Sequence, residues 1–502
     1  LSSQLSDDCY ESADTPKDLF TKLRDLNYPA IVIPHGNTWG FYTPPASSLD
    51  KQLISEFNDD NLQILFEVMS GHGNSEEYRP WRALIEDNQG ELSCPKPSKN
   101  YLPSCWRAGQ IIEERCIDNG FSESECSIRA EEARQNYAAM GVAGHLTVPG
   151  VEIEDWLDSG QCRDCFIPSF NYRPAGSAQY GLAISNFDQN KPIRFNFGFI
   201  ASSDNHRARP GTGYKEINRF VTTEANGPSD EFIGDILYPV EQPADRSIDL
   251  REQPLLGLRT GFGSFEAERE ASFFTTGGLA AVHSSGRDRN SIWEGLRNKE
   301  TYGTSGDRIL LWFDLVQGET ISPMGSTVTQ ASNPIFRIKA VGAFEQKPGC
   351  PDYSATNITQ EHLERICKNE CYNPSDRRKN ISKIEVVKIT PQITQNESLE
   401  SLIKDTWKTF ECKPSQEGCE VEFFDSEFQS EGRDSIYYVR AIQEPSPVIN
   451  GGNLRCSYDE NGECIKVNIC YGDSRTDKDD DCLSLSEERA WSSPIYINFS
   501  QI

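Results

Sequence analysis

The stretch Ala30-Ile31-Val32-Ile33-Pro34-His35-Gly36-Asn37 joins a short apolar run to a turn that contains a histidine. Its apolar residues do not alternate with polar ones, which is typical of a β-strand buried on both faces. A helix that starts after Thr15-Pro16 precedes it, with an apolar stripe made of Leu19, Phe20, Leu23 and Leu26. A helix followed by a buried strand predicts an α/β unit with His35 at the strand's carboxyl end.

Three later segments repeat this arrangement of an apolar strand followed by a polar turn. They are residues 64–68 followed by His72, residues 195–200 followed by Asp204-Asn205-His206, and residues 279–282 followed by His283. Four of the six histidines therefore follow a predicted strand. Parallel α/β folds bind ligands at this edge, because the loops after the strands converge there. The sequence predicts an α/β barrel over residues 1–305.

A disulfide-bonded helical insertion is expected at about residues 94–180. Residues 107–119 and 124–140 predict two helices, and Cys116 and Cys126 flank the turn between them. The motif Cys162-Arg-Asp-Cys165 lacks the strand-to-helix context of a redox centre. A structural bridge is therefore favoured over redox function.

The second half, residues 306–502, predicts an antiparallel β-sandwich with disulfide-rich loops. Its expected strands are residues 308–315, 334–341, 384–390, 421–424, 435–441 and 491–497, separated by turn clusters. Residues 473–481 contain five aspartates and are a candidate structural calcium site. They lack the glycine and glutamate of an EF-hand loop, so a solvated acidic turn is favoured.

The sixteen cysteines indicate an oxidising compartment, so the protein is expected to be secreted or periplasmic. They form one group of seven, from Cys9 to Cys165, and one of nine, from Cys350 to Cys482. Because both numbers are odd, either a bridge joins the groups or two thiols stay unpaired. Four glycosylation sequons are compatible with secretion: Asn357, Asn380, Asn396 and Asn498.

The charge of −28 argues against nucleic acid or anionic lipid as a partner, because such a surface repels both. No stretch of 18 apolar residues is present, so no membrane span is expected. A small anionic substrate would need a local positive site, which metal ions would supply. The oligomeric state stays open, with a homo-oligomer as one option.

Asp204 and His206 form the sharpest candidate site, because a carboxylate and an imidazole on one tight turn can bind adjacent metals. The alternative is a turn aspartate that caps backbone N–H groups beside a surface histidine. His35 is a suitable ligand for zinc, manganese or iron, although a lone histidine is more often structural. Glu67, in a buried strand, needs a metal or a partner such as Arg79 or Arg82.

Further residues around these turns have candidate catalytic roles. His72, on a glycine-rich turn, is a candidate proton donor or substrate contact. Arg79 and Arg207 are candidates for holding a phosphate or carboxylate group, together with Arg82 and Arg209. For His283 a structural or supporting role is favoured, because the following loop looks like an ordinary helix entry.

Several long motifs resemble a bacterial family catalogued as domain of unknown function 3604. These motifs are Ile33-Pro-His-Gly-Asn-Thr-Trp-Gly, Ser70-Gly-His-Gly-Asn-Ser-Glu-Glu-Tyr-Arg-Pro-Trp-Arg, Ser202-Ser-Asp-Asn-His and Tyr302-Gly-Thr-Ser-Gly-Asp-Arg-Ile. That family is similar to the polymerase-and-histidinol-phosphatase (PHP) superfamily of metal-dependent phosphoesterases. The resemblance implies a distorted (β/α)₇ barrel with a multinuclear metal cluster, in which His35, Asp204 and His206 are ligands. Glu67 matches an acidic position that need not bind metal.

The chain departs from this pattern at its start. The superfamily's opening H-x-H, its T-D-H element and its bridging glutamate would precede His35, and this chain has no H-x-H. The first residue is Leu1 rather than methionine. We therefore expect an incomplete barrel, with the other ligands on an upstream segment or on a companion chain from the same precursor.

The leading hypothesis from the sequence is a secreted metal-dependent hydrolase, most of all a phosphoesterase, with metals at the strand ends. The alternative is a catalytically inactive binding or structural protein on a PHP-like scaffold. Amide or C–O bond hydrolysis on the same metal cluster is a third option.

Overall fold

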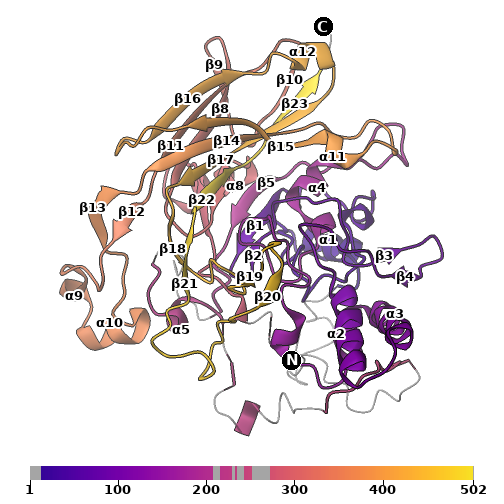
Figure 1. Ribbon diagram of the computed structural model, residues 1–502. Helices are drawn as coiled ribbons and strands as arrows, with labels where there is room; N and C mark the ends of the chain where they lie inside the picture. The colour runs from indigo at the N-terminus through magenta and orange to yellow at the C-terminus, as the bar shows by residue number, and fades with distance from the viewer. Residues whose placement is uncertain are drawn as a thin grey trace.

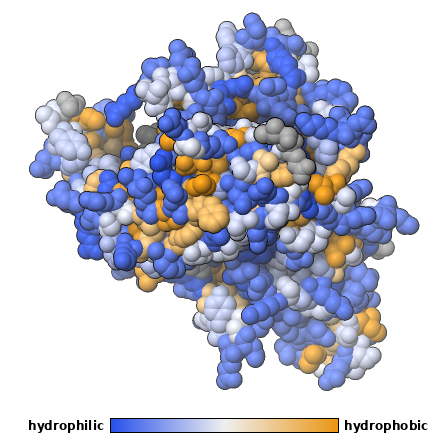
Figure 2. Space-filling view, turned by 90° about the horizontal axis from the view of Figure 1, so that it is seen from above, coloured by the Kyte–Doolittle hydropathy of each residue, from blue (hydrophilic) through white to orange (hydrophobic). Residues whose placement is uncertain are grey.

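The computed structural model describes residues 13–206, 215–225, 227, 228, 232–234, 242–251, 269 and 272–500. The chain combines a mixed α/β first half with a second half made mainly of antiparallel strands (Figure 1). No helix in these ranges has the length and apolar character needed to cross a membrane. Figure 2 shows that the face seen from above is largely hydrophilic, in keeping with the acidic composition.

In the first predicted α/β unit, the helix prediction is confirmed and the strand prediction is wrong. Helix α1 (Pro16–Asp25) starts at Thr15, whose side chain accepts a hydrogen bond from Asp18 N. Residues 30–33 form no strand, and Ile33 is 40% exposed. One ladder-type hydrogen bond, from Val32 N to Leu62 O, holds this extended segment. A buried strand needs neighbours on both sides, and the described residues supply only this contact.

A three-stranded sheet supports the candidate site. Its order is β2-β1-β5, with β1 at Leu65–Ser70, β2 at Gly73–Asn74 and β5 at Gly198–Ala201. Strand β1 is buried along its whole length, as its apolar run predicts, and it pairs in parallel with β5. The strands of the described residues do not close into a barrel. The parallel edge predicted from the sequence is therefore present, but a complete barrel is not.

The predicted strand at residues 279–282 exists, but it joins another sheet. Strand β6 (Leu279–Val282) pairs antiparallel with β7 (Thr301–Thr304), and helix α8 (Arg289–Arg297) connects them. Its residues are exposed or half-buried, so the expectation of a strand buried in a parallel sheet is wrong. Short apolar runs do not distinguish parallel from antiparallel pairing.

The insertion contains the two expected helices. Helix α2 (Ser104–Asp118) and helix α3 (Glu123–Met140) pack against each other, and the Cys116–Cys126 disulfide closes the turn between them. The other short helical elements of the first half are η2 (Leu49–Lys51), η3 (Gly141–Thr147), η4 (Ile153–Trp156), η5 (Pro174–Gly176), α4 (Ala178–Ala183) and α5 (Arg219–Thr222). Strands β3 (Ile85–Glu86) and β4 (Leu92–Ser93) form a short hairpin.

The second half is sandwich-like, with two mainly antiparallel sheets around a common apolar core. One sheet has the order β16-β11-β8-β9, from β16 (Cys419–Phe424), β11 (Ile335–Val341), β8 (Leu310–Gln317) and β9 (Thr320–Pro323). The other sheet contains β6 and β7, which were described above. Its further strands are β10 (Thr327–Gln330), β23 (Ile495–Phe499), β17 (Ser435–Gln443), β22 (Arg489–Ser492), β14 (Ile381–Ile389) and β15 (Ile403–Glu411). Phe313, Phe336 and Tyr437 are fully buried between them.

Short elements complete the second half. The two-stranded ribbons are β12 (Phe344–Gln346) with β13 (Pro374–Arg378), β18 (Ser446–Ile449) with β21 (Leu483–Ser486), and β19 (Ser457–Tyr458) with β20 (Cys464–Lys466). The helices are α9 (Ser354–Asn357), α10 (Gln360–Cys367), α11 (Leu399–Leu402) and α12 (Phe428–Glu431).

Glu76 connects the first half of the chain to the second through buried hydrogen bonds. It is fully buried, and it accepts hydrogen bonds from the Tyr438 hydroxyl at 2.5 Å and from Arg440 Nε at 2.7 Å. Arg440 also contacts Glu385 at 3.2 Å and Asp405 at 2.5 Å. Because Glu76 and Arg440 are both buried, loss of the Arg440 cation would leave Glu76 without its charged partner.

Seven disulfides in the described residues indicate an oxidising compartment. They pair the cysteines within each of the two sequence groups: 94–105, 116–126, 162–165, 350–371, 412–419, 456–464 and 470–482. Cys367 is free in the part of the chain that the structure describes, and Cys9 lies outside that part.

Candidate metal site

The candidate site is built on the parallel pair of strands β1 and β5. Met69 pairs with Ala201, so the loops after the two strands begin side by side. A side chain at Gly71 would meet Ser203 O at 2.9 Å and Asp204 Cβ at 3.0 Å. Glycine therefore allows the turn after β1 to approach the turn after β5 this closely.

Glu67, on β1, holds His35 by a hydrogen bond. His35 Nδ1 lies 2.7 Å from Glu67 Oε2, and Ser202 Oγ donates to Glu67 Oε1 at 2.5 Å. Burial alone would raise the pKa of Glu67, but the hydrogen bond with His35 and the nearby His72 ring lower it to about 2. The same hydrogen bond raises the pKa of His35, against the opposing effect of burial. An ionised carboxylate only accepts, so Nδ1 donates and Nε2 keeps its lone pair for a ligand.

Asp204 lies between the two histidines of the predicted ligand set. His35 Nε2 is 4.0 Å from Asp204 Oδ1, and His206 Nε2 is 3.9 Å from the same oxygen. Asp204 has a left-handed backbone with φ 54°, a conformation that costs energy for a non-glycine residue. On its other side, the His206 ring has Nδ1 at 3.9 Å from Glu224 Oε2, and Glu224 also accepts a hydrogen bond from Asn205.

Each histidine of this set is spaced from Asp204 as two ligands of a divalent transition metal can be. Among the described residues, the three do not form one group whose potential ligand atoms all lie within 4.8 Å of one another, so shared binding of one ion requires the side chains to move. Metal–ligand bonds to imidazole and carboxylate are about 2.0–2.2 Å, so two ligands of one ion lie up to about 4 Å apart. The contacts of His35 and His206 to Asp204 fall within that separation. Two nitrogen donors with one oxygen suit zinc, manganese or iron. The Asp204 side chain is 11% exposed and that of His206 is 71% exposed, so solvent reaches the site from the His206 side.

His72 lies beside this set in a buried position. Its ring stacks on Trp39, with centroids 5.0 Å apart and planes at 8°, and it meets the His35 ring edge-on. Nε2 is 3.8 Å from Glu67 Oε2, beyond hydrogen-bond distance. Among the described residues, neither ring nitrogen of His72 has a hydrogen-bond partner. His35, Glu67 and His72 also form a group whose potential ligand atoms lie within 4.8 Å of one another.

The arginines predicted for substrate binding do not join this cluster in the described residues. Arg79 contacts Asp164 at 3.1 Å, Glu77 at 3.4 Å and Asp405 at 4.0 Å, so neighbouring carboxylates neutralise its guanidinium. Arg82 donates to the hydroxyl of Tyr180 at 3.3 Å. The predicted Arg207, and Arg209 with it, lie outside the described residues.

His283 has a packing role in the structure. Its Nε2 lies 2.9 Å from Leu311 O, where it can only donate, and its ring contacts Tyr302 and Trp312. This geometry agrees with the structural interpretation of the sequence.

Two other groups of potential metal ligands contain disulfide-bonded sulfurs. They are Asp158 with Cys456 and Cys464, and Asp164 with Cys162 and Cys165. Among the described residues, the acidic segment 473–481 contributes to no such group. Its aspartates pair with arginine, as Asp473 does with Arg475 at 2.6 Å, or accept from backbone N–H groups. The interpretation as a solvated acidic turn agrees with these contacts.

Residues 170–342 match the family described as "Protein of unknown function (DUF3604)". The match spans roughly a third of the 502 residues. It includes Asp204 and His206, whereas His35, Glu67 and His72 precede it. No curated protein and no solved structure matches the chain.

Sequence reasoning missed three residues that shape the site. Ser202 and Trp39 lie inside the quoted motifs, which is a usable signal, but their contacts with Glu67 and His72 are tertiary. Glu224 follows no recognisable motif, and it reaches His206 only through the tertiary fold.

Proposed function

We propose that this chain is a secreted metal-dependent hydrolase that acts on phosphate esters, on a PHP-like scaffold. The supporting observation is that His35 Nε2 and His206 Nε2 both lie within 4.0 Å of one oxygen of Asp204. The disulfides support an oxidising location. The sequence motifs resemble the DUF3604 family, and the expected similarity of that family to the PHP phosphoesterases supports the reaction class.

In this proposal His35, Asp204 and His206 hold zinc, manganese or iron, and the bound metal would acidify a water molecule and neutralise charge on the phosphate. Three protein donors leave coordination positions open for water, for substrate or for a companion polypeptide. Glu67 uses both carboxylate oxygens on His35 and Ser202, so it orients the imidazole rather than binding the ion. Asp204 and His206 also form part of the entrance for solvent and substrate.

His72 is proposed to deliver a proton to the leaving group. Its ring is buried, stacked on Trp39 and without a hydrogen-bond partner in the described part of the chain, so a substrate oxygen can become that partner. Arg79 is bound to carboxylates and contributes no free charge, which leaves Arg207 as the candidate for orienting an anionic group.

A direct test is hydrolysis of p-nitrophenyl phosphate and bis(p-nitrophenyl) phosphate after chelation, with zinc, manganese or iron(II) restored one at a time. We expect turnover that depends on the metal and that Asp204→Asn abolishes. Turnover that survives chelation, or an Asp204→Asn variant with full activity, would contradict the proposal.

The alternative is an inactive binding or structural protein, and the small number of protein donors favours it. Purified protein that binds zinc, manganese and iron no better than the Asp204→Asn variant, and that hydrolyses no ester, amide or glycoside, would support this alternative. If the protein cleaves only amide or C–O bonds and needs the metal to do so, the result would support the metal site and assign a different substrate class.

A further inference from the structure

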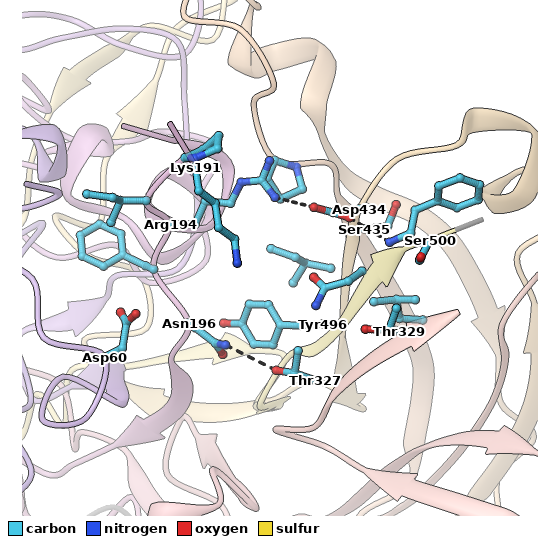
Figure 3. A pocket seen from close by; sticks show the side chains of 18 of the residues that line it. Asp60, Lys191, Arg194, Asn196, Thr327, Thr329, Asp434, Ser435, Tyr496 and Ser500 are labelled. Atoms are coloured by element: carbon cyan, nitrogen blue, oxygen red, sulfur yellow. Dashed lines mark hydrogen bonds and ion pairs between the residues drawn. The ribbon is translucent and has the colours of Figure 1, made fainter. Parts of the chain in front are cut away.

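A cavity of about 660 Å³ lies between the two halves of the chain, away from the candidate metal site (Figure 3). The segment 189–196 forms one side, with Asp60, and strands β10, β17 and β23 contribute the other. Residues 195 and 196 precede β5, whereas Asp204 follows it. The cavity is therefore at the amino end of the strand and the candidate metal site is at its carboxyl end.

Lys191 is the one cation of the cavity wall that has no carboxylate partner among the described residues. Arg194 and Asp434, both in its wall, neutralise each other at 2.6 Å. Lys191 also lies in the wall, and it makes no hydrogen bond or ion pair within the ranges that the structure describes. Lys299 does not line the cavity but contacts Asn196 and Tyr496 of its wall, and Asp60, the remaining carboxylate of the wall, is its opposing charge. In a chain with a net charge of −28, a cavity wall with a free lysine favours binding of an anion.

Lys299 is an ammonium group that has lost much of its water. It donates to Asn196 Oδ1, and its Nζ lies 5.2 Å from the centre of the Tyr496 ring. Burial lowers its pKa to about 8, with Asp60 as the opposing charge. Asn196 and Tyr496 both line the cavity, so an anion bound there would approach this partly desolvated cation.

The rest of the wall combines short polar side chains with apolar ones. Figure 3 shows Lys191 and Arg194 on one side, Thr327, Thr329 and Ser500 on the other, and Tyr496 with Asn196 between them. The hydroxyl and amide groups can both donate and accept, as a ligand with several hydroxyls requires. Apolar contact comes from residues such as Phe195, Ile436 and Tyr496. The volume is in the range of about 300–1,000 Å³ typical of small-molecule sites.

We propose that this cavity binds a small acidic sugar, a hydroxyl-rich ring with one carboxylate or sulfate group. Lys191 recognises the anionic group, and the threonine, serine and asparagine side chains recognise the hydroxyls. The proposal does not depend on hydrolase activity, because no residue of the candidate metal site lines this cavity.

Titration calorimetry of the full chain with four probes tests this proposal: galacturonic acid, galactose 6-sulfate, galactose and sodium acetate. We expect saturable binding of at least one acidic sugar, and weaker or undetectable binding of galactose and acetate. Added NaCl is expected to weaken the binding, because salt screens the exposed Lys191. Preference for the carboxylate or the sulfate probe identifies the anionic group.

Lys191→Gln is expected to weaken binding of the acidic sugar by about tenfold, as for loss of one charge-assisted contact. Lys413→Gln, on an exposed lysine outside the cavity, is the matched control and is expected to bind normally. The proposal is overturned if neither acidic sugar binds, if galactose or acetate binds as tightly, or if Lys191→Gln and Lys413→Gln behave alike. Since Lys191 is exposed, both variants are expected to fold, which circular dichroism checks.

Discussion

His35 Nδ1 lies 2.7 Å from Glu67 Oε2, and this contact decides which nitrogen of His35 is available to a ligand. Burial acts to raise the pKa of Glu67, yet the two neighbouring imidazoles lower it to about 2, so the carboxylate is ionised at neutral pH. An ionised carboxylate must accept, so Nδ1 is protonated and Nε2 faces Asp204. A carboxylate, a histidine and a metal in this order form an arrangement that protein metal sites often use.

Glu67→Gln is expected to weaken metal binding by about 10–100-fold, the usual effect of removing such an outer carboxylate. The glutamine can still accept from Nδ1, but it has no charge to strengthen the imidazole as a ligand. Competition with a chromophoric chelator measures the affinity. Glu86→Gln, on the exposed hairpin strand β3, is the control. Equal affinities for the two variants would show that Glu67 does not support the site.

His72→Gln is expected to separate catalysis from metal binding. If His72 delivers a proton, its loss lowers kcat by about 10²–10⁴-fold while the metal content stays that of the wild type. Steady-state kinetics and elemental analysis on the same preparations measure both quantities. A variant that loses the metal together with the activity would instead make His72 a ligand, as its position in the group with His35 and Glu67 would allow.

Arg440→Met is expected to destabilise the protein by about 3–5 kcal/mol, because it leaves the buried Glu76 carboxylate without its cation. Glu76 and Asp405 lie 2.7 Å and 2.5 Å from this guanidinium. Urea unfolding followed by fluorescence measures the change. Lys17→Met, which breaks the exposed pair with Glu56, is expected to cause no measurable change. Similar urea midpoints for the two variants would contradict the proposed role of Arg440 in connecting the two halves of the chain.

The stability of the chain is expected to fall as the pH rises through neutrality, partly because of Glu488. Burial raises its pKa from 4.5 to about 7, with the charge of Asp307 adding to the effect. Between these two values the folded state binds more protons than the unfolded state, so the favourable contribution is complete below pH 4.5 and is lost above about pH 7.

Glu488→Gln removes this titration, since the amide stays neutral. Relative to the wild type, its free energy of unfolding is expected to increase between pH 5 and pH 8, by up to about 3 kcal/mol. Any constant cost of the lost hydrogen bond from Ser305 cancels in that comparison. Urea unfolding at several pH values measures it. A difference between variant and wild type that does not change with pH would show that Glu488 is ionised in the folded state already at pH 5.

The sequence predicted the local features of this fold better than their arrangement. The run at residues 64–68 is long and apolar enough to indicate a buried strand, and β1 is one. The similar run at residues 30–33 has no strand neighbours in the described structure, so periodicity alone misassigned it. Strand β6 was placed correctly along the chain, but its antiparallel pairing depends on β7, which no local pattern reveals.

The same distinction applies to the candidate site. His35, Asp204 and His206 could be selected because each follows an apolar segment in a polar turn, and the structure brings them together. Arg79 looked equally suitable in the sequence, but its surroundings contain three carboxylates that bind it. Glu224 could not be selected, because its only signal is a tertiary contact with His206.

Metal binding at Asp204 is the most direct test of the central claim that His35, Asp204 and His206 share metal ions. Equilibrium dialysis against zinc and against manganese, followed by elemental analysis, is done on the wild type, on Asp204→Asn and on Asp188→Asn, an exposed control. We predict at least one ion per wild-type chain, the same content in Asp188→Asn, and a loss in Asp204→Asn. A wild type without metal, or an Asp204→Asn variant that keeps the full content, would contradict the claim.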